Sequence, residues 1–328
     1  MKEPQPLDFE KPIMELQRRL QEIRDHSDEH ALDFDAEVEA MEAKIETTRR
    51  EIYDNLNAWQ RVQIARHTQR PFALDYVERC FTNWNELHGD RLFGDDKAMP
   101  CGIAMLGEHR CIVVTNQKGR DTKENVLRNF GCAHPEGYRK ALRLMQLAEK
   151  FNVPVISLID TPGAYPGIGS EERHIAEAIA VNLREMMKLR VPILAAVIGE
   201  GGSGGALGIG VADHVMILEN AYYSVISPEA CSAILWKDRR HAAEAAEALK
   251  LTAQDLMKFH VVDEIVPEPD GGAHRDHEKA AELLGNALRS NLERLLKITI
   301  NQLLKKRYDK FRRLGNFIEP PKGNGAAG

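Results

Sequence analysis

The sequence predicts an α/β protein that begins with a separate helical arm. The first seventy or so residues combine many charged side chains with apolar residues at helical spacing. From about Pro71, short β-branched runs alternate with longer amphipathic stretches, which is typical of buried strands alternating with helices. With 328 residues and 43% hydrophobic content, the chain can bury a sizeable core. We therefore predict a helical arm over 1–70, an α/β domain over 71–297, and a C-terminal helix with a flexible tail over 298–328.

The arm is predicted to be an antiparallel hairpin of two helices. Asp35 is the expected N-cap of the second helix. Such an arm packs against its own domain or against a partner, so we expect no catalytic role for it. Apolar residues recur at helical spacing on both sides of the acidic linker DHSDEHALDFD, namely Ile13, Leu16, Leu20 and Ile23 before it and Val38, Met41, Ile45 and Ile52 after it.

The α/β domain contains four short apolar runs that we interpret as buried strands. These runs span residues 111–117, 153–160, 191–199 and 214–219. Amphipathic stretches predict helices over 136–150, 171–189, 276–297 and 298–313. A further helix is expected to begin at Ser227-Pro228-Glu229, with Cys231 and Trp236 in the core. The last helix ends in the basic run KKRYDKFRR, and the final PPKGNGAAG is expected to be a frayed tail.

Composition excludes several classes of protein. A formal net charge of −6 argues against specific binding of nucleic acid. The five cysteines are odd in number and never form C-x-x-C, so we expect reduced, mostly buried thiols and no metal site. No apolar run approaches the roughly 20 residues of a membrane helix, and the N-terminus lacks the pattern of a signal peptide. These features predict a cytoplasmic protein that does not contact a membrane.

The stretch VIGEGGSGGALGIG, residues 197–210, follows a predicted strand and holds an unusual density of glycine. It is consistent with a tight strand-to-helix turn that packs closely against its neighbours. A dinucleotide-binding fingerprint is less consistent with it, because no acidic residue follows a second strand at the required spacing. A phosphate-binding Walker loop is excluded, since no Gly-Lys-Ser/Thr occurs in the chain.

The same stretch also satisfies G-x-S-x-G, the motif of a serine hydrolase. Ser203 would be the nucleophile of that motif, between a strand and a helix. His214, His241 and His260 follow it, so the chain order Ser, Asp, His is available. The glycines on both sides of Ser203 make a chance match easy.

A further interpretation uses the backbone of this turn instead of a side chain. The amides of Gly204 and Gly205 stand just before Ala206-Leu207, where a helix could begin, and amides at a helix start bind an oxyanion. A second glycine-rich turn, 160–167, follows another predicted strand. Adjacent parallel strands would bring both turns to one crevice. Tyr165 is either one wall of that crevice or a packed aromatic.

Several long motifs carry a resemblance to a known family. GEGGSGGAL, IDTPGAYPG, QKGRDTKEN, PEGYRKALRLMQLAEKF and SVISPEACSAILWK occur in this order. They resemble the alpha subunits of bacterial acetyl-coenzyme A carboxylase carboxyltransferases, and the resemblance runs through essentially the whole chain. It implies that 71–297 is a crotonase-like carboxyltransferase domain with a core of repeated β-β-α units.

The resemblance also implies an activity and a set of partners. Members of this family move a carboxyl group from carboxybiotin on the biotin carboxyl carrier protein to acetyl-CoA, giving malonyl-CoA for fatty acid biosynthesis. They act with a zinc-bearing beta subunit in an α2β2 heterotetramer. ATP is consumed by the biotin carboxylase component, and no metal is expected in this chain.

Placing the family's chemistry on this sequence gives a set of candidate site residues. Gly204 and Gly205 are expected to form an oxyanion hole for the ureido oxygen of biotin. The remaining candidates are Gly163, Ala164, Tyr165 and Ala206 for binding biotin, and Lys118, Gly119 and Arg120 for contacts with CoA or the partner chain. An autonomous hydratase or isomerase that uses Glu171 and Glu172 is an alternative, although paired carboxylates that open a helix are more typical of the surface. A non-catalytic scaffold that only docks the carrier protein is another.

Overall fold

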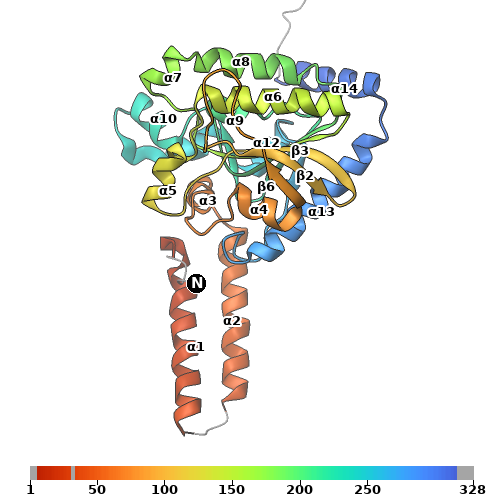
Figure 1. Cartoon of the computed structure of the whole chain (residues 1–328). Helices are drawn as coiled ribbons and strands as arrows, with labels where there is room; N and C mark the ends of the chain where they lie inside the picture. Colours follow the sequence, from red (N-terminus) through yellow and green to blue (C-terminus); the bar gives the residue numbers. More distant parts are fainter. Residues whose placement is uncertain (1–5, 31–33, 316–328) are drawn as a thin grey trace, which may run out of the picture.

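The N-terminal arm is a long helical hairpin that projects from the body of the molecule (Figure 1). The computed structural model describes residues 6–30 and 34–315. A short turn of 3-10 helix, η1 (Asp8–Glu10), leads into α1 (Lys11–His30), and α2 (Asp35–Asp54) returns to the body. The seam between the helices buries Ile13, Leu16, Leu20 and Ile45, which confirms the predicted hairpin. Asp35 was wrongly expected to be the N-cap, because Phe34 takes that position and Asp35 is the first residue of the helix.

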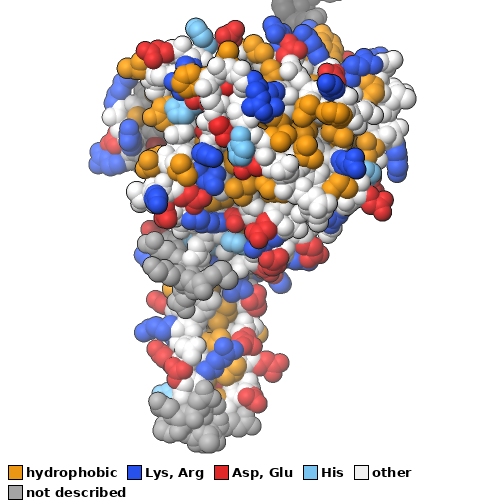
Figure 2. All heavy atoms as spheres, viewed as in Figure 1, with side chains coloured by type: hydrophobic (Ala, Val, Ile, Leu, Met, Phe, Trp, Pro, Cys, Tyr) orange, Lys and Arg blue, Asp and Glu red, His pale blue; other side chains and the backbone are white. Residues whose placement is uncertain are grey.

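A buried carboxylate fastens the arm to the body. The Glu10 side chain is fully buried and accepts hydrogen bonds from the Tyr53 hydroxyl at 2.8 Å and from the Arg275 guanidinium at 2.5 Å. Burial by itself would raise the pKa of Glu10, but the nearby His274 ring and the hydrogen-bonded Arg275 guanidinium hold it well below its usual range. Charged side chains cover the outside of the arm (Figure 2). The position of the arm is therefore set at its base.

The body is built on one eight-stranded mixed sheet. Its strand order is β1-β2-β3-β4-β5-β6-β8, and β7 pairs with the end of β5. The first three strands pair antiparallel, and the rest of the sheet is parallel. The strands are β1 (Thr82–Glu86), β2 (Cys101–Leu106), β3 (His109–Thr115), β4 (Val155–Thr161), β5 (Ile193–Gly202), β6 (His214–Leu218), β7 (Tyr222–Ser224) and β8 (Glu264–Val266). The four predicted strands are thus confirmed as β3, β4, β5 and β6.

Helices cover both sides of this sheet (Figure 1). On one side lie α6 (Pro135–Phe151) and α8 (Ile175–Met186), and on the other lie α4 (Ala73–Cys80) and α13 (His277–Leu296). The predicted helices near the C-terminus are confirmed as α13 and α14 (Ile300–Arg312). The remaining helices are α3 (Ala58–Ala65), α5 (Thr122–Leu127), η2 (Asn129–Gly131), α7 (Ile168–Glu172), α9 (Ser203–Leu207), α10 (Pro228–Leu235), η3 (Arg239–His241), α11 (Ala242–Leu249) and α12 (Ala253–Lys258).

Two expectations about the helical regions are wrong. The single helix predicted over 171–189 is two helices, α7 and α8, because His174 adopts a left-handed backbone with φ of 64° that interrupts the helical path. Trp236, which we expected in the core next to Cys231, follows the end of α10 and is 42% exposed, whereas Cys231 is buried. Helical spacing alone does not show whether the residue that follows the last turn of a helix still lies in the core.

The cysteines agree with the sequence analysis. All five are free thiols, four of them buried and Cys132 half-buried. The described residues contain no group of three or more His, Cys, Asp or Glu side chains arranged to hold a metal ion. Within the same residues, no helix combines the length and the apolar character needed to cross a membrane. The predicted frayed tail lies outside the described residues.

Buried ion pairs make the stability of this fold depend on pH. Glu268 is fully buried against Arg70, and although burial alone would raise the pKa of Glu268, the guanidinium lowers it to about 2. Because its folded-state pKa lies below the unfolded value, Glu268 stabilises the protein above about pH 4.5 and loses this contribution as the pH falls towards about 2. Glu200 and Asp90 also have a pKa of about 2 and act in the same direction.

We expect the free energy of unfolding to fall as the pH is lowered through this window. In urea titrations, Glu268→Gln should lower stability at neutral pH and flatten the dependence between about pH 5 and pH 2. The control Glu22→Gln alters an exposed arm residue and should leave the stability at neutral pH and its pH dependence unchanged. A Glu268→Gln protein with the wild-type pH dependence would contradict this assignment.

Candidate active site

The two glycine-rich turns predicted from the sequence meet at the carboxyl ends of β4 and β5. These strands are parallel neighbours, and Thr161 at the end of β4 pairs with Gly201 on β5. The turn of residues 162–167 follows the first strand, and α9 follows the second. The expectation that both turns share one edge of the sheet is therefore confirmed. Such an edge is where open α/β sheets bind their ligands.

Close contact between the turns explains two of the glycines. A Cβ on Gly202 would lie 2.1 Å from the Pro162 carbonyl oxygen, and one on Gly205 would lie 2.4 Å from the Gly163 carbonyl carbon. A Cβ atom cannot approach a backbone atom this closely, so neither position admits a residue with a side chain. Gly204 differs, because its nearest neighbour would be the Ile179 side chain at 3.6 Å, an ordinary contact. The structure thus supports the interpretation of a tightly packed turn, which is compatible with a role for the backbone amides.

The helix after β5 begins earlier than the sequence suggested. It starts at Ser203, not at Ala206, and has only five residues. The amides of Ser203, Gly204 and Gly205 lie in its first turn, where backbone N–H groups have no acceptor within the helix. The Tyr138 hydroxyl donates to the Gly205 carbonyl oxygen at 3.2 Å and so holds this turn from below.

The facing turn is held by side-chain and backbone hydrogen bonds. The Thr161 hydroxyl contacts the carbonyl oxygens of Gly131 and Gly163 at 2.7 and 2.8 Å. The Tyr165 amide donates to the Ala133 carbonyl oxygen, and the Tyr165 ring packs on the His134 ring with centroids 4.3 Å apart. Tyr165 is 36% exposed, so it is both a packed aromatic and part of the surface beside the turns.

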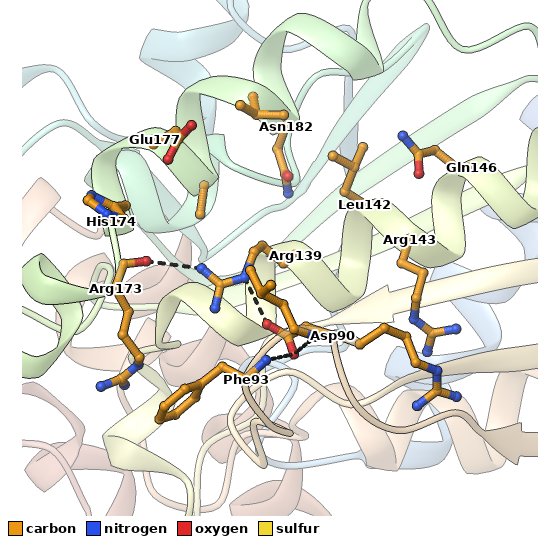
Figure 3. Close-up of a pocket in the computed structure, with 14 residues that line it drawn as sticks. Asp90, Phe93, Arg139, Leu142, Arg143, Gln146, Arg173, His174, Glu177 and Asn182 are labelled. Atoms are coloured by element: carbon orange, nitrogen blue, oxygen red, sulfur yellow. Dashed lines mark hydrogen bonds and ion pairs between the residues drawn. The ribbon is translucent and has the colours of Figure 1, made fainter.

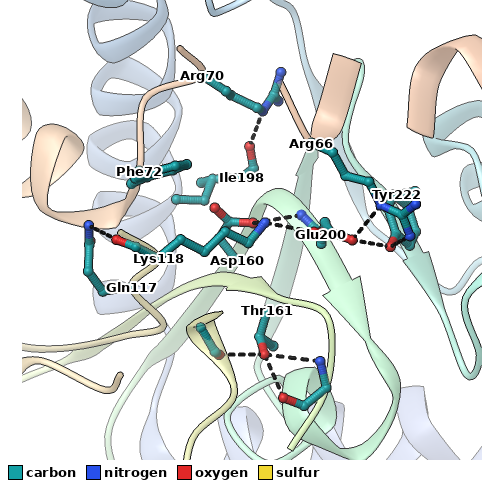
Figure 4. A network of polar contacts seen from close by, with 12 residues as sticks. Arg66, Arg70, Phe72, Gln117, Lys118, Asp160, Thr161, Ile198, Glu200 and Tyr222 are labelled. Carbon is teal, nitrogen blue, oxygen red and sulfur yellow. Dashed lines mark hydrogen bonds and ion pairs between the residues drawn. The ribbon is translucent and has the colours of Figure 1, made fainter. Parts of the chain in front are cut away.

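A buried charge network underlies both turns (Figure 4). The Lys118 ammonium lies 2.6 Å from an Asp160 oxygen and 2.9 Å from a Glu200 oxygen, and the Glu200 amide donates to Asp160 at 2.9 Å. Arg66 and the Tyr222 hydroxyl donate to the other Glu200 oxygen at 2.8 and 2.5 Å. Asp160 and Glu200 lie near the carboxyl ends of β4 and β5, so this network joins the strand ends from which the turns start.

Glu200 and Lys118 are held in their charged forms in this network, whereas burial raises the pKa of Asp160 above its usual value. Burial would raise the pKa of Glu200, but the nearby Lys118 and Arg66 cations and the Tyr222 hydroxyl lower it to about 2. Burial alone would lower the pKa of Lys118, but the two carboxylates raise it above its usual value. Asp160 and Glu200 were not among the site residues predicted from the sequence. A charged residue at the end of an apolar strand, directly before a glycine turn, is the signal that could have found them.

The loop proposed to contact CoA or a partner makes mainly internal contacts. Lys118 is held by the two carboxylates just described, and the Gly119 amide donates to the Asn125 side chain at 3.1 Å. The Arg120 guanidinium donates to the carbonyl oxygens of Thr68 and Arg70, both at 2.9 Å, and its side chain is 37% exposed. Of these three residues, only Arg120 is substantially exposed, and its guanidinium is paired with the Asp75 carboxylate.

An apolar groove of about 300 Å³ lies beside the second turn. Its lining includes Ser203, Gly204, Leu207 and Tyr223, and its far wall includes Phe311 of α14. None of the residues that line it is a histidine or a carboxylate, so no side-chain base adjoins Ser203 there. Glu171 and Glu172, the carboxylates considered for hydratase chemistry, are exposed. This neighbourhood suits binding by backbone and apolar surface more than catalysis by a side-chain acid or base.

Comparison with known proteins decides between the alternatives. The family described as "Acetyl co-enzyme A carboxylase carboxyltransferase-like" matches residues 6–315. The chain belongs to this family. An acetyl-coenzyme A carboxylase carboxyl transferase subunit alpha from Syntrophotalea carbinolica is 56% identical over 307 residues, 93% of this chain and 96% of the relative. Its counterpart from Thermus thermophilus is 53% identical over 315 residues, 96% of this chain and all of the relative.

Two solved structures with low sequence identity share the fold. Transcarboxylase 12S aligns with a TM-score of 0.53 at 16% identity, over 78% of this chain and 44% of its own. A Pseudomonas malonate decarboxylase hetero-tetramer in complex with coenzyme A aligns with a TM-score of 0.54 at 14% identity, over 66% and 86%. The crotonase-like fold that we expected for this chain is confirmed. The comparisons do not favour the alternatives of a serine hydrolase or an autonomous hydratase.

Proposed function

We propose that this chain, paired with a beta subunit, transfers the carboxyl group of carboxybiotin to acetyl-CoA and forms malonyl-CoA for fatty acid biosynthesis. The observation that carries the proposal is the contact between the two glycine turns at the ends of β4 and β5, with no side-chain base in the adjoining groove. The 53–56% identity to carboxyl transferase alpha subunits supports the same reaction.

The turns fit a flat ligand with a developing negative charge. Carboxybiotin supplies the carboxyl group and, once this has left, a ring nitrogen that can accept a proton from acetyl-CoA. We assign the amides of Gly204 and Gly205 to hydrogen bonds with the ureido oxygen, because the first-turn amides of α9 need an acceptor outside the helix. Gly204 lines the apolar groove, which leaves room for a ring beside these amides.

The neighbouring residues have supporting roles in this proposal. Gly163, Ala164 and Tyr165 would form the opposite wall of the biotin site, because their turn contacts Gly205. Ala206 is fully buried beneath Gly205, so it would shape the site through the backbone. We keep Gly119 and Arg120 as contacts for CoA or the beta subunit, with Arg120 as the exposed cation. Lys118 would act on such a ligand only through the turns that it supports.

The proposal also covers the assembly in which the reaction takes place. A zinc-bearing beta subunit would complete an α2β2 heterotetramer and hold the acetyl-CoA thioester. The biotin carboxyl carrier protein would deliver carboxybiotin, and a separate biotin carboxylase would consume ATP to load it. We place this assembly in the cytoplasm.

An activity measurement on the full-length chain tests the proposal. The chain alone, the beta subunit alone and the co-purified pair are assayed for biotin-dependent decarboxylation of malonyl-CoA, the reverse of the proposed transfer. We expect activity only for the pair. Hydration or isomerisation of an enoyl-CoA by the chain alone would overturn the proposal in favour of an autonomous enzyme, and an inactive but assembled pair would favour a scaffold.

Replacing Ser203 separates the backbone role from a nucleophilic one. Ser203 is exposed and has a left-handed backbone with φ of 49°, which alanine tolerates about as well as serine. We expect Ser203→Ala to keep turnover within about threefold of wild type, as is usual for a surface change that removes no reacting group. Labelling of Ser203 by a fluorophosphonate, with parallel loss of turnover, would instead identify it as a nucleophile.

A further inference from the structure

A second cavity lies away from the glycine turns, between α6, the start of α8 and the loop of residues 89–94 (Figure 3). Its volume is about 660 Å³, within the range typical of small-molecule sites. Four arginines line it, Arg91, Arg139, Arg143 and Arg173, against only two carboxylates, Asp90 and Glu177. The cavity therefore carries excess positive charge in a chain whose net charge is −6.

Two of the four arginines are already neutralised. Arg139 donates to Asp90 at 2.8 Å, and Figure 3 shows its guanidinium directed at that carboxylate. Arg173 forms two hydrogen bonds with Glu136, at 3.0 and 3.1 Å, and its guanidinium lies 4.5 Å from the centre of the Phe93 ring. Neither group requires an anion from outside.

Arg91 and Arg143 are different, because neither forms an ion pair in the described part of the chain. Their guanidinium groups are neighbours, since Arg91 and Arg143 each donate to the His88 carbonyl oxygen at 3.2 Å. Arg143 also donates to the Gly89 carbonyl oxygen at 3.1 Å. Partial burial and the nearby Arg91 cation lower the pKa of Arg143, as expected for like charges held together. A bound anion would relieve this repulsion.

The surroundings of this pair indicate more than a bare ion. The apolar side chain of Leu142 lines the cavity between Arg139 and Arg143, and Phe93, at the tip of the loop, is 66% exposed. Arg91 itself has a left-handed backbone with φ of 66°, so the loop places its side chain at a conformational cost. Paired guanidinium groups match the geometry and the double charge of a phosphate.

We propose that this cavity is a binding site for an organic phosphate. The phosphate is held by Arg91 and Arg143, and the apolar or aromatic part of the ligand packs against Leu142 and Phe93. Two sources share this chemistry. The phosphate is either that of coenzyme A, a substrate under the function proposed above, or that of a separate metabolite that binds without reacting.

Calorimetry with inorganic pyrophosphate tests the site on the full-length chain. We expect saturable binding that weakens with added salt, and a loss of affinity of about tenfold or more in Arg91→Gln and in Arg143→Gln, since each removes a charge-assisted contact. The matched control Arg190→Gln changes an exposed arginine outside the cavity and should bind like wild type. Absence of saturable binding to wild type, or equal affinity in all four proteins, overturns the proposal.

Kinetics of the assembled enzyme then distinguish the two sources. If the phosphate is that of coenzyme A, Arg143→Gln raises the KM for malonyl-CoA and weakens binding of coenzyme A while kcat is kept. If the ligand is a separate metabolite, that KM is unchanged although pyrophosphate binding is lost. Both results retain the site. Because the calorimetry needs no turnover, it stands whether or not the carboxyltransferase function is upheld.

Discussion

Gly205→Ala is expected to lower carboxyl transfer by about 10²–10³-fold, the loss typical for one oxyanion-hole donor. The new Cβ would lie 2.4 Å from the Gly163 carbonyl carbon and 2.5 Å from the Ala164 nitrogen, both of them backbone atoms. Backbone cannot rotate aside as a side chain can, so the two turns must separate. The Gly205 amide then moves relative to the oxygen that it is proposed to stabilise.

Turnover of the assembled enzyme measures this effect. Circular dichroism and co-purification with the beta subunit establish that the variant folds and assembles. Gly285→Ala on α13 is the matched control, because a Cβ there would meet only side-chain atoms at 3.5 Å or more and should leave turnover unchanged. Affinity for the carrier protein should change much less than turnover, since docking uses a larger surface than this contact. Wild-type turnover in a correctly assembled Gly205→Ala enzyme would limit these glycines to a packing role.

Lys118→Met is expected to reduce both stability and turnover. The Lys118 ammonium is buried between Asp160 and Glu200, and its removal leaves these two buried carboxylates with less positive charge beside them. Breaking a buried ion pair by removing one partner costs about 3–5 kcal/mol. Because the two carboxylates lie near the carboxyl ends of β4 and β5, the strand ends should shift and turnover should fall with stability.

Chemical unfolding and turnover at saturating substrate are the measurements for Lys118. Lys188→Met is the matched control, since Lys188 is 64% exposed and pairs with Glu185 on the surface, where such a pair contributes less than about 1 kcal/mol. The double variant Lys118→Met/Asp160→Asn removes one charge of each sign and should recover part of the stability. Equal stability of Lys118→Met and Lys188→Met would show that the network does not hold the turns.

Local pattern was sufficient to predict the helical arm, the central strands of the sheet and the longer helices of the body. The arm follows from apolar residues such as Ile13 and Leu16 that recur on one helical face, and β3 to β6 follow from short apolar runs. The pattern failed at His174, where a left-handed residue divides a helix, and at Trp236, where the chain leaves the core. Both failures depend on how neighbouring segments pack, which helical periodicity does not encode.

The sequence by itself determined the class of fold, the helical arm, the two glycine turns and, through its long motifs, the family. Only the tertiary structure decided which groups meet at these turns. Asp160 lies 42 residues after Lys118, and Glu200 lies 40 residues after Asp160. The three side chains converge because β3, β4 and β5 are adjacent parallel strands. Likewise, Arg91 and Arg143 become a pair through the His88 carbonyl oxygen. Contacts of this kind depend on register and loop path, so neither spacing nor composition reveals them.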